Sequence, residues 1–218
     1  MSEILYDLFL ASLLLSAAMA LINFKHLRSR QLLLFAPYLI LLSIQEFGVH
    51  IYLNFHPTQK TGILYNLSRP VSTTFFAVFF FLIPVNRPFR RLISWMLGVY
   101  ITLVTATFVF VHSIVEYNSY LSLASAFVIS CSGILFLFNY FNLDNTEEEK
   151  RWRPVVWITT GLVIFYPVIN IVFSFYKKIL AVEASIFDTP LHQAVPRIMS
   201  IFMYGCFSYA FYLCQKKN

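Results

Sequence analysis

The stretch Gln45–His50, which reads QEFGVH, lies inside one long apolar segment, and Tyr65–Pro70, which reads YNLSRP, lies inside the next. An acid, an imidazole and a guanidinium therefore stand at Glu46, His50 and Arg69, where a membrane helix normally carries hydrocarbon. Each such group is costly at membrane depth unless it faces the protein interior, a charged partner or water. We interpret the stretch as one wall of a polar pocket inside a bundle of membrane helices.

The composition is typical of a helical membrane protein. The 218 residues are 59% hydrophobic and 12% charged, and that charged share is about half the share found in soluble domains. Apolar segments of helical membrane-span length follow one another with only short loops between them. The predicted spans are residues 4–24, 31–53, 63–85, 92–114, 118–141, 154–176 and 193–214. The pattern predicts an all-α integral membrane protein, a single seven-transmembrane helix bundle over residues 1–218, without a soluble catalytic or DNA-binding module.

The distribution of lysine and arginine predicts the orientation of the bundle. Eleven of these residues follow odd-numbered predicted spans, three follow even-numbered ones, and Arg69 and Arg197 lie within spans. Because cytoplasmic loops are enriched in lysine and arginine, we expect the N-terminus outside and the C-terminus in the cytoplasm of a plasma or bacterial inner membrane. The net charge of +6 comes mainly from these short loops, so it indicates contact with the lipid bilayer and no nucleic-acid partner.

The ionisable residues within or beside the spans gather toward the predicted outer ends. They are Asp7, Glu46, His50, Arg69, His112 and Arg197. We therefore expect a vestibule open to the outside, where Arg69 and Arg197 hold the acid group of a small anionic or amphiphilic ligand and Glu46 with His50 tunes it. The candidate ligand-binding residues are Glu46, His50, Tyr65, Asn66, Arg69, His112, Arg197 and Tyr204.

Two other interpretations of these residues stay open. Glu46 can pair with Arg69 or with Arg197 and merely lock helices together, as intramembrane charges often do. Glu46 and His50, four residues apart, can also face one ion together with His112, but zinc needs three or four such ligands and no HExxH motif occurs. An intramembrane metal-dependent enzyme is therefore one alternative, and a small transporter or a subunit of a membrane complex is another.

The leading hypothesis from the sequence is a membrane sensor or receptor-like protein that binds its ligand from outside. No catalytic residue is assigned, because no GxSxG motif or glycine-rich phosphate loop occurs, and no cofactor is expected. The signal would pass to a separate cytoplasmic or membrane partner through the predicted loops at residues 86–91 and 142–153. The layout resembles that of rhodopsin-like receptors, but residues 193–214 contain no lysine for a retinal Schiff base, so we assign no family.

Overall fold

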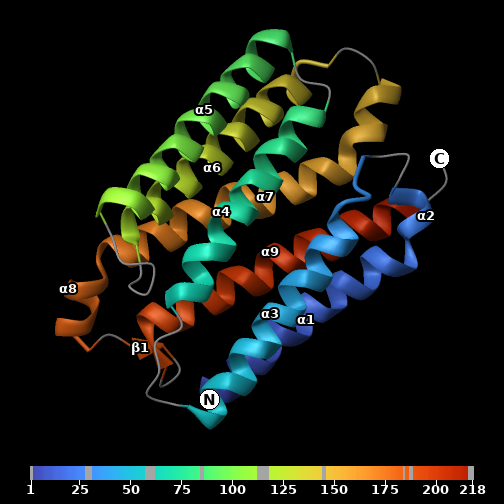
Figure 1. The fold of residues 1–218 in the computed structure, drawn as a ribbon. Helices are drawn as coiled ribbons and strands as arrows, with labels where there is room; N and C mark the ends of the chain where they lie inside the picture. Colours follow the sequence, from blue (N-terminus) through green and yellow to red (C-terminus); the bar gives the residue numbers. More distant parts are fainter. Residues whose placement is uncertain are drawn as a thin grey trace. The chain divides into compact units, whose positions relative to one another are not determined.

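A computed structural model describes residues 2–27, 31–56, 62–83, 86–111, 118–143, 146–183, 185–186 and 189–215. Helices make up nearly all of this part of the chain (Figure 1), which confirms the predicted all-α class. They are α1 (Ser2–Ile22), α2 (Phe24–Leu27), α3 (Phe35–Phe55), α4 (Gly62–Leu82), α5 (Arg87–Ala106), the π-helix η2 (Thr107–Val111), α6 (Ser119–Phe141), α7 (Thr146–Ser174), α8 (Tyr176–Ala181) and α9 (Leu191–Gln215). The short strands β1 (Ser185–Ile186) and β2 (Thr189–Pro190) pair antiparallel before α9.

Six of the described helices are long and apolar enough to cross a membrane, namely α1, α3, α5, α6, α7 and α9. Each of the seven predicted spans overlaps one long helix. The seventh helix, α4, has 21 residues, but the polar residues Asn66, Ser68 and Arg69 in its first half make it less hydrophobic. The membrane class is therefore supported by six helices, while the count of seven spans and the orientation stay predictions.

Two predicted loops are largely helical, which corrects their assignment as loops at residues 86–91 and 142–153. Helix α5 begins at Arg87 with Pro88 in its first turn, where proline is tolerated because the first backbone N–H groups have no partner within the helix. Helix α7 begins at Thr146, eight residues before Pro154. The acids Glu147, Glu148 and Glu149 stand in its first turn, where negative charge complements the helix dipole.

The chain divides into two compact units, and each is described by itself. Unit 1 is Met1–Ile51 with Leu143–Asn218, and unit 2 is Tyr52–Asn142. Unit 1 therefore joins the two ends of the sequence, whereas unit 2 is its middle. The prediction of one domain over residues 1–218 stays a prediction.

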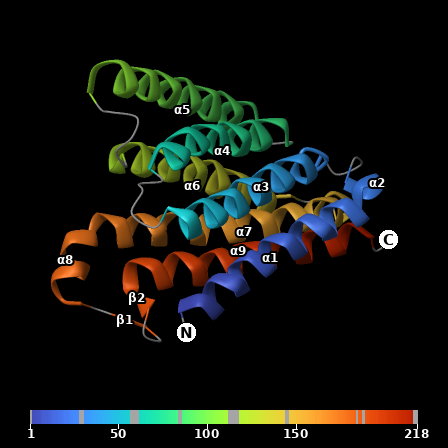
Figure 2. The same cartoon turned by 60° about the horizontal axis from the view of Figure 1, so that its bottom comes forward.

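In unit 1, α9 packs along both α1 and α7, and all three helices are drawn close together in both views (Figures 1 and 2). Helices α7 and α9 lie close together at Gly161, where an added Cβ would lie 3.1 Å from the Cys206 Cβ and 3.3 Å from the Met203 carbonyl oxygen. Helix α3 joins this group through Phe35, whose ring meets those of Phe207 and Phe211 edge-on at 5.7 and 6.0 Å. Small and aromatic residues thus contribute to the core of unit 1 beside buried leucine, isoleucine and valine side chains.

In unit 2, the sequential helices α4, α5 and α6 pack against one another. Ala77, Tyr100 and Val128, one from each helix, form a shared buried cluster. The Phe80 and Phe136 rings extend the contact of α4 with α6, at 6.3 Å between centroids. Each of the three helices therefore contributes one face to a common core.

Candidate functional site

Helices α1 and α9 begin at the same end of unit 1, where the part of α3 that belongs to this unit ends (Figure 1). Aromatic and charged side chains of these three helices contact one another there. The Tyr6 ring of α1 is at the centre of this cluster. The His50 ring of α3 stacks on Tyr6 at 5.0 Å between centroids and 23° between planes. The Arg197 guanidinium of α9 lies over the Tyr6 ring, 5.1 Å from its centroid. Residues more than 140 positions apart in the sequence therefore meet on one ring.

Two carboxylates complete the electrostatic environment of this cluster. Glu46 on α3 and Asp7 on α1 both interact electrostatically with Tyr6, as Arg197 does. Tyr6, Glu46, His50 and Arg197 are half-buried, whereas Asp7 is exposed. The cluster therefore contains two acids, one permanent cation and one titratable imidazole, in side chains that solvent still reaches. We call Tyr6, Asp7, Glu46, His50 and Arg197 the Tyr6 cluster.

Local helical geometry explains why these residues meet. Glu46 and His50 are four residues apart on α3, so they project from the same face of that helix. Tyr6 is four residues into α1 and Arg197 six residues into α9, which at the helical rise places both about 6–9 Å below the helix ends. The cluster therefore lies below the end of unit 1 and above its apolar core, at a depth where charges still reach water or headgroups.

Tyr204 does not belong to the rim of this site. It lies seven residues beyond Arg197 on α9, about 10 Å deeper along the helix axis. The side chain is only 4% exposed, and its ring packs against Phe9 at 6.2 Å and Phe207 at 5.9 Å. The predicted ligand-binding residue Tyr204 is therefore placed in the core beneath the cluster, where it supports α1 against α9.

The candidate residues Tyr65, Asn66 and Arg69 lie on α4, in unit 2. Asn66 is 3% exposed, and its side-chain oxygen accepts a hydrogen bond from the backbone N–H of Asn118 at 3.2 Å. The Asn118 side chain in turn accepts bonds from the N–H groups of Tyr120 and Leu121 and caps the start of α6. Asn66 therefore fixes α4 to α6. The predicted joint site of Arg69 with Glu46 and Arg197 stays a prediction.

The metal hypothesis depends on His112, which lies outside the described residues. Among the residues that the structure describes, no group of three or more histidine, cysteine, aspartate or glutamate side chains is arranged to hold a metal ion. Glu46 and His50 alone supply two ligands, and a zinc site requires at least three from the protein. The alternative of Glu46, His50 and His112 as a metal site therefore remains untested.

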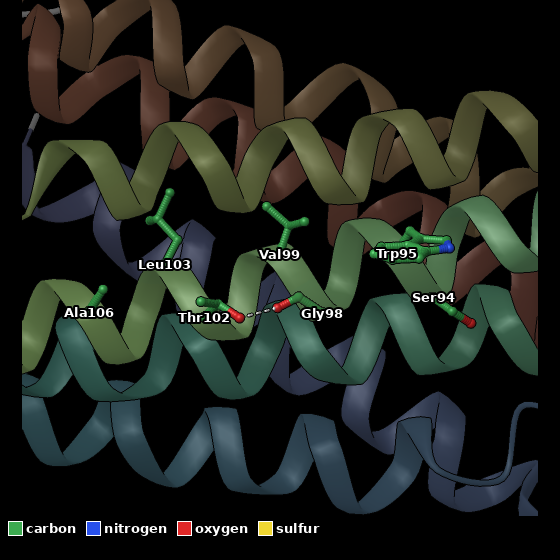
Figure 3. A pocket seen from close by; sticks show the side chains of 7 residues that line it. All are labelled: Ser94, Trp95, Gly98, Val99, Thr102, Leu103 and Ala106. Atoms are coloured by element: carbon green, nitrogen blue, oxygen red, sulfur yellow. Dashed lines mark hydrogen bonds between the residues drawn. The ribbon is translucent and has the colours of Figure 1, made fainter.

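A shallow groove runs along α5 and is lined by Ser94, Trp95, Gly98, Val99, Thr102, Leu103 and Ala106. Figure 3 shows that all seven side chains come from this one helix. The Thr102 hydroxyl donates to the Gly98 carbonyl at 3.0 Å, and the Ser94 hydroxyl donates to the Arg90 carbonyl at 3.1 Å. Since both hydroxyls already donate to the helix itself, the groove presents a mainly apolar face suited to lipid. None of the predicted site residues lies in it.

Sequence reasoning missed the central role of Tyr6. The residue stands in the first predicted span beside Asp7, whose charge already indicated the outer end, but tyrosine is common in membrane helices and carries little signal by itself. Asn118 was missed as a capping residue, although an asparagine directly before an apolar run is the expected signal.

Comparisons of this chain with protein-family models, with curated proteins and with solved structures find no match.

Proposed function

We propose that the chain is a membrane receptor or sensor that binds a small ligand with an acid group at the Tyr6 cluster and signals to a separate partner. The observation that carries the proposal is the position of Arg197, whose guanidinium lies over the Tyr6 ring at 5.1 Å. This contact orients the guanidinium of Arg197. The planar fork of N–H donors in a guanidinium binds a carboxylate or phosphate with two parallel hydrogen bonds. The half-buried His50 and Glu46 of α3 also interact with Tyr6 and would adjust the electrostatic potential at the site.

We further infer seven membrane spans. Helix α4 has 21 residues, which at the helical rise corresponds to about 31 Å, the thickness of a bilayer core. It also packs along α5 and α6, both of which are apolar enough to cross a membrane. A helix that shares a core with two spanning neighbours has the length and the partners to span with them, and its polar residues Asn66 and Thr73 are buried.

Seven spans and the lysine and arginine distribution together would place the Tyr6 cluster on the outer side of a plasma or bacterial inner membrane. The ligand would then enter from outside. The first turns of α5 and α7 would face the cytoplasm, and Arg87 and Glu148 there are exposed. This arrangement supports a receptor, since ligand and partner would meet opposite ends of the same helices.

The test is the effect of Arg197→Gln on ligand-induced thermal stabilisation of the purified chain in lipid nanodiscs. Butyrate and decanoate serve as probes, because they carry the same acid group on a short and a long apolar tail. We expect the wild type to be stabilised by at least one of them and Arg197→Gln to lose about tenfold in apparent affinity, since a charge-assisted hydrogen bond contributes about 1.5–3 kcal/mol.

Arg151→Gln is the matched control. Arg151 also lies 5.1 Å from an aromatic ring centroid, that of Trp152, but it is exposed and stands near the beginning of α7. This variant removes the same charge and the same type of contact without touching the Tyr6 cluster. Equal responses of Arg197→Gln and the wild type to both probes would contradict the assignment of the acid-binding role to Arg197.

A further inference from the structure

Exposed aromatic side chains of α7 and α9 contact one another in unit 1, away from the Tyr6 cluster. The Trp157 indole of α7 meets the Tyr209 ring of α9 edge-on, at 4.8 Å between centroids and 82° between planes. The Tyr212 ring lies 6.4 Å from that of Tyr209, and all three side chains are between 37% and 42% exposed. Tyr209 lies twelve residues beyond Arg197 on α9, about 18 Å along the helix axis.

Arg153 belongs to the same exposed face. It lies one turn before Trp157 on α7 and is exposed as well. Helices α7 and α9 lie side by side and run antiparallel (Figures 1 and 2). One turn back along α7 from the contact of Trp157 with Tyr209 therefore places Arg153 near the level of Tyr212. We call Arg153, Trp157, Tyr209 and Tyr212 the Trp157 patch.

Two donor groups of the Trp157 patch have no acceptor in the part of the chain that the structure describes. Arg153 makes no hydrogen bond, ion pair or ring contact with a described residue, including Glu149, the acid one turn earlier on the same face. The indole N–H of Trp157 likewise donates to no described residue. Because the Cα–Cβ bonds of a helix tilt toward its N-terminus, Trp157 leans toward Arg153. Both donors are therefore available to an acceptor outside the described chain.

The Trp157 patch lies where the surface of this helix pair changes from charged to apolar. The charged residues of α7 all precede Pro154, and α9 carries no acid, lysine or arginine after Arg197. Tryptophan and tyrosine gather where the apolar part of a membrane protein meets the lipid headgroups. Phospholipid phosphates lie at this level, so the patch presents a guanidinium and an N–H donor at the depth of a phosphate.

We propose that the Trp157 patch binds an anionic phospholipid, whose phosphate accepts hydrogen bonds from the Arg153 guanidinium and the Trp157 indole N–H. The edge-on contact with Tyr209 holds the indole in place. One turn deeper on α9, an added Cβ on the exposed Gly205 would meet no atom within 4 Å, so an acyl chain has room against the helix. This site does not depend on the proposed receptor function.

The charge of the Trp157 patch favours an anionic lipid over a zwitterionic one. The guanidinium of Arg153 attracts a phosphate, but it repels the choline cation that phosphatidylcholine carries beside its phosphate. Phosphatidylglycerol carries the phosphate without that cation. A basic site between membrane helices is typical of the sites that bind anionic headgroups.

The test compares dioleoylphosphatidylglycerol with dioleoylphosphatidylcholine, which have the same acyl chains, on the purified full chain in dodecyl maltoside. The thermal midpoint is followed against lipid concentration. We expect phosphatidylglycerol to stabilise the protein at about tenfold lower concentration, because its charge-assisted hydrogen bonds form without an opposing cation. Glycerol 3-phosphate carries a phosphate without acyl chains and should leave the midpoint unchanged at the concentrations at which phosphatidylglycerol acts.

Arg153→Gln should reduce the tenfold preference to about twofold or less. Arg151→Gln is the matched control, because it removes the same charge two residues earlier, from a side chain that lies over the buried Trp152 ring. Trp157→Phe keeps an aromatic ring but lacks the N–H donor, and it should reduce the preference about threefold. Trp95→Phe removes an exposed indole from α5 in unit 2 and should leave the preference unchanged.

Three outcomes would overturn the lipid site. The first is an equal response of the wild type to the two lipids. The second is a preference that Arg153→Gln retains, or that Arg151→Gln loses to the same extent, because the lipid would then respond only to the general charge of this end of α7. The third is stabilisation by glycerol 3-phosphate at the concentrations at which phosphatidylglycerol acts, which would assign the patch to a free phosphate compound.

Discussion

Buried polar groups in unit 2 bond to one another across helices, whereas the charged side chains of the Tyr6 cluster in unit 1 lie near helix ends. In unit 2, Asn66 accepts the Asn118 N–H, and the Tyr100 hydroxyl bonds to Ser125 at 2.8 Å. These four side chains are at most 3% exposed. In the Tyr6 cluster no side chain is buried to that degree.

This difference indicates two roles for polar residues in one membrane protein. Neutral groups at depth satisfy one another and hold helices together, because an unpaired polar group there is costly. Ionisable groups near a helix end retain access to water, so they can exchange one partner for another. In unit 1, Gly161 of α7 lies close to Cys206 and Met203 of α9. Variants that alter one unit at a time can test this comparison.

The largest expected effect is that of Gly161→Leu in unit 1. The first added carbon would already lie 3.1 Å from the Cys206 Cβ and 3.3 Å from the Met203 carbonyl oxygen. The backbone part of this contact cannot move aside as a flexible side chain would. We expect α7 to separate from α9 and the free energy of unfolding to fall by about 3 kcal/mol, the upper part of the range for overpacked cores.

Unfolding in mixed micelles of dodecyl maltoside and increasing SDS measures this change. Gly205→Leu is the control, because it lies on α9 close to the same contact but an added Cβ meets no atom within 4 Å. If both variants lose the same stability, the effect comes from glycine replacement in general, and close packing at Gly161 is not what holds unit 1.

The next effect in size is that of Asn66→Ala in unit 2. The substitution removes the acceptor of the buried Asn118 N–H and leaves that donor without its partner on α4. A buried backbone donor without a partner costs about 1–3 kcal/mol, so we expect a loss of about 2 kcal/mol in the same unfolding measurement. The control is Leu67→Ala, which truncates the exposed neighbouring side chain on α4. An Asn66→Ala variant as stable as Leu67→Ala would show that the α4–α6 bond does not stabilise unit 2.

The sequence predicted the helices of both units well but not their contacts. Apolar segments of span length fix where a membrane helix lies, since only a helix satisfies its own backbone there. The ends of the helices were less predictable. The charged residues 147–153 indicated a loop, yet they belong to α7, because acids in a first turn favour a helix. Glu46, His50 and Arg197 were candidates from the sequence, and their binding role stays a prediction. The ring of Tyr6 that unites them depends on the rotation of α1 against α3 and α9, which hydropathy does not encode.

The smallest effect on stability is expected for Arg197→Lys. This variant most sharply distinguishes a ligand-binding role of Arg197 from a structural one. Lysine keeps the positive charge over the Tyr6 ring but lacks the planar fork of donors. A cation–π contact at a partly open site contributes about 0.5–1 kcal/mol, and lysine retains part of it, so the free energy of unfolding should fall by no more than about 0.5 kcal/mol.

The ligand response should nevertheless weaken, because one of the two parallel bonds to the acid group is lost. We expect about fivefold weaker binding of butyrate or decanoate, a smaller loss than in Arg197→Gln. Small loss of stability with a large loss of response would assign Arg197 to binding. Were Arg197→Lys to lose as much stability as Asn66→Ala, the Tyr6 cluster would hold helices together just as the polar bonds of unit 2 do. The two units would then differ only in where their polar contacts lie.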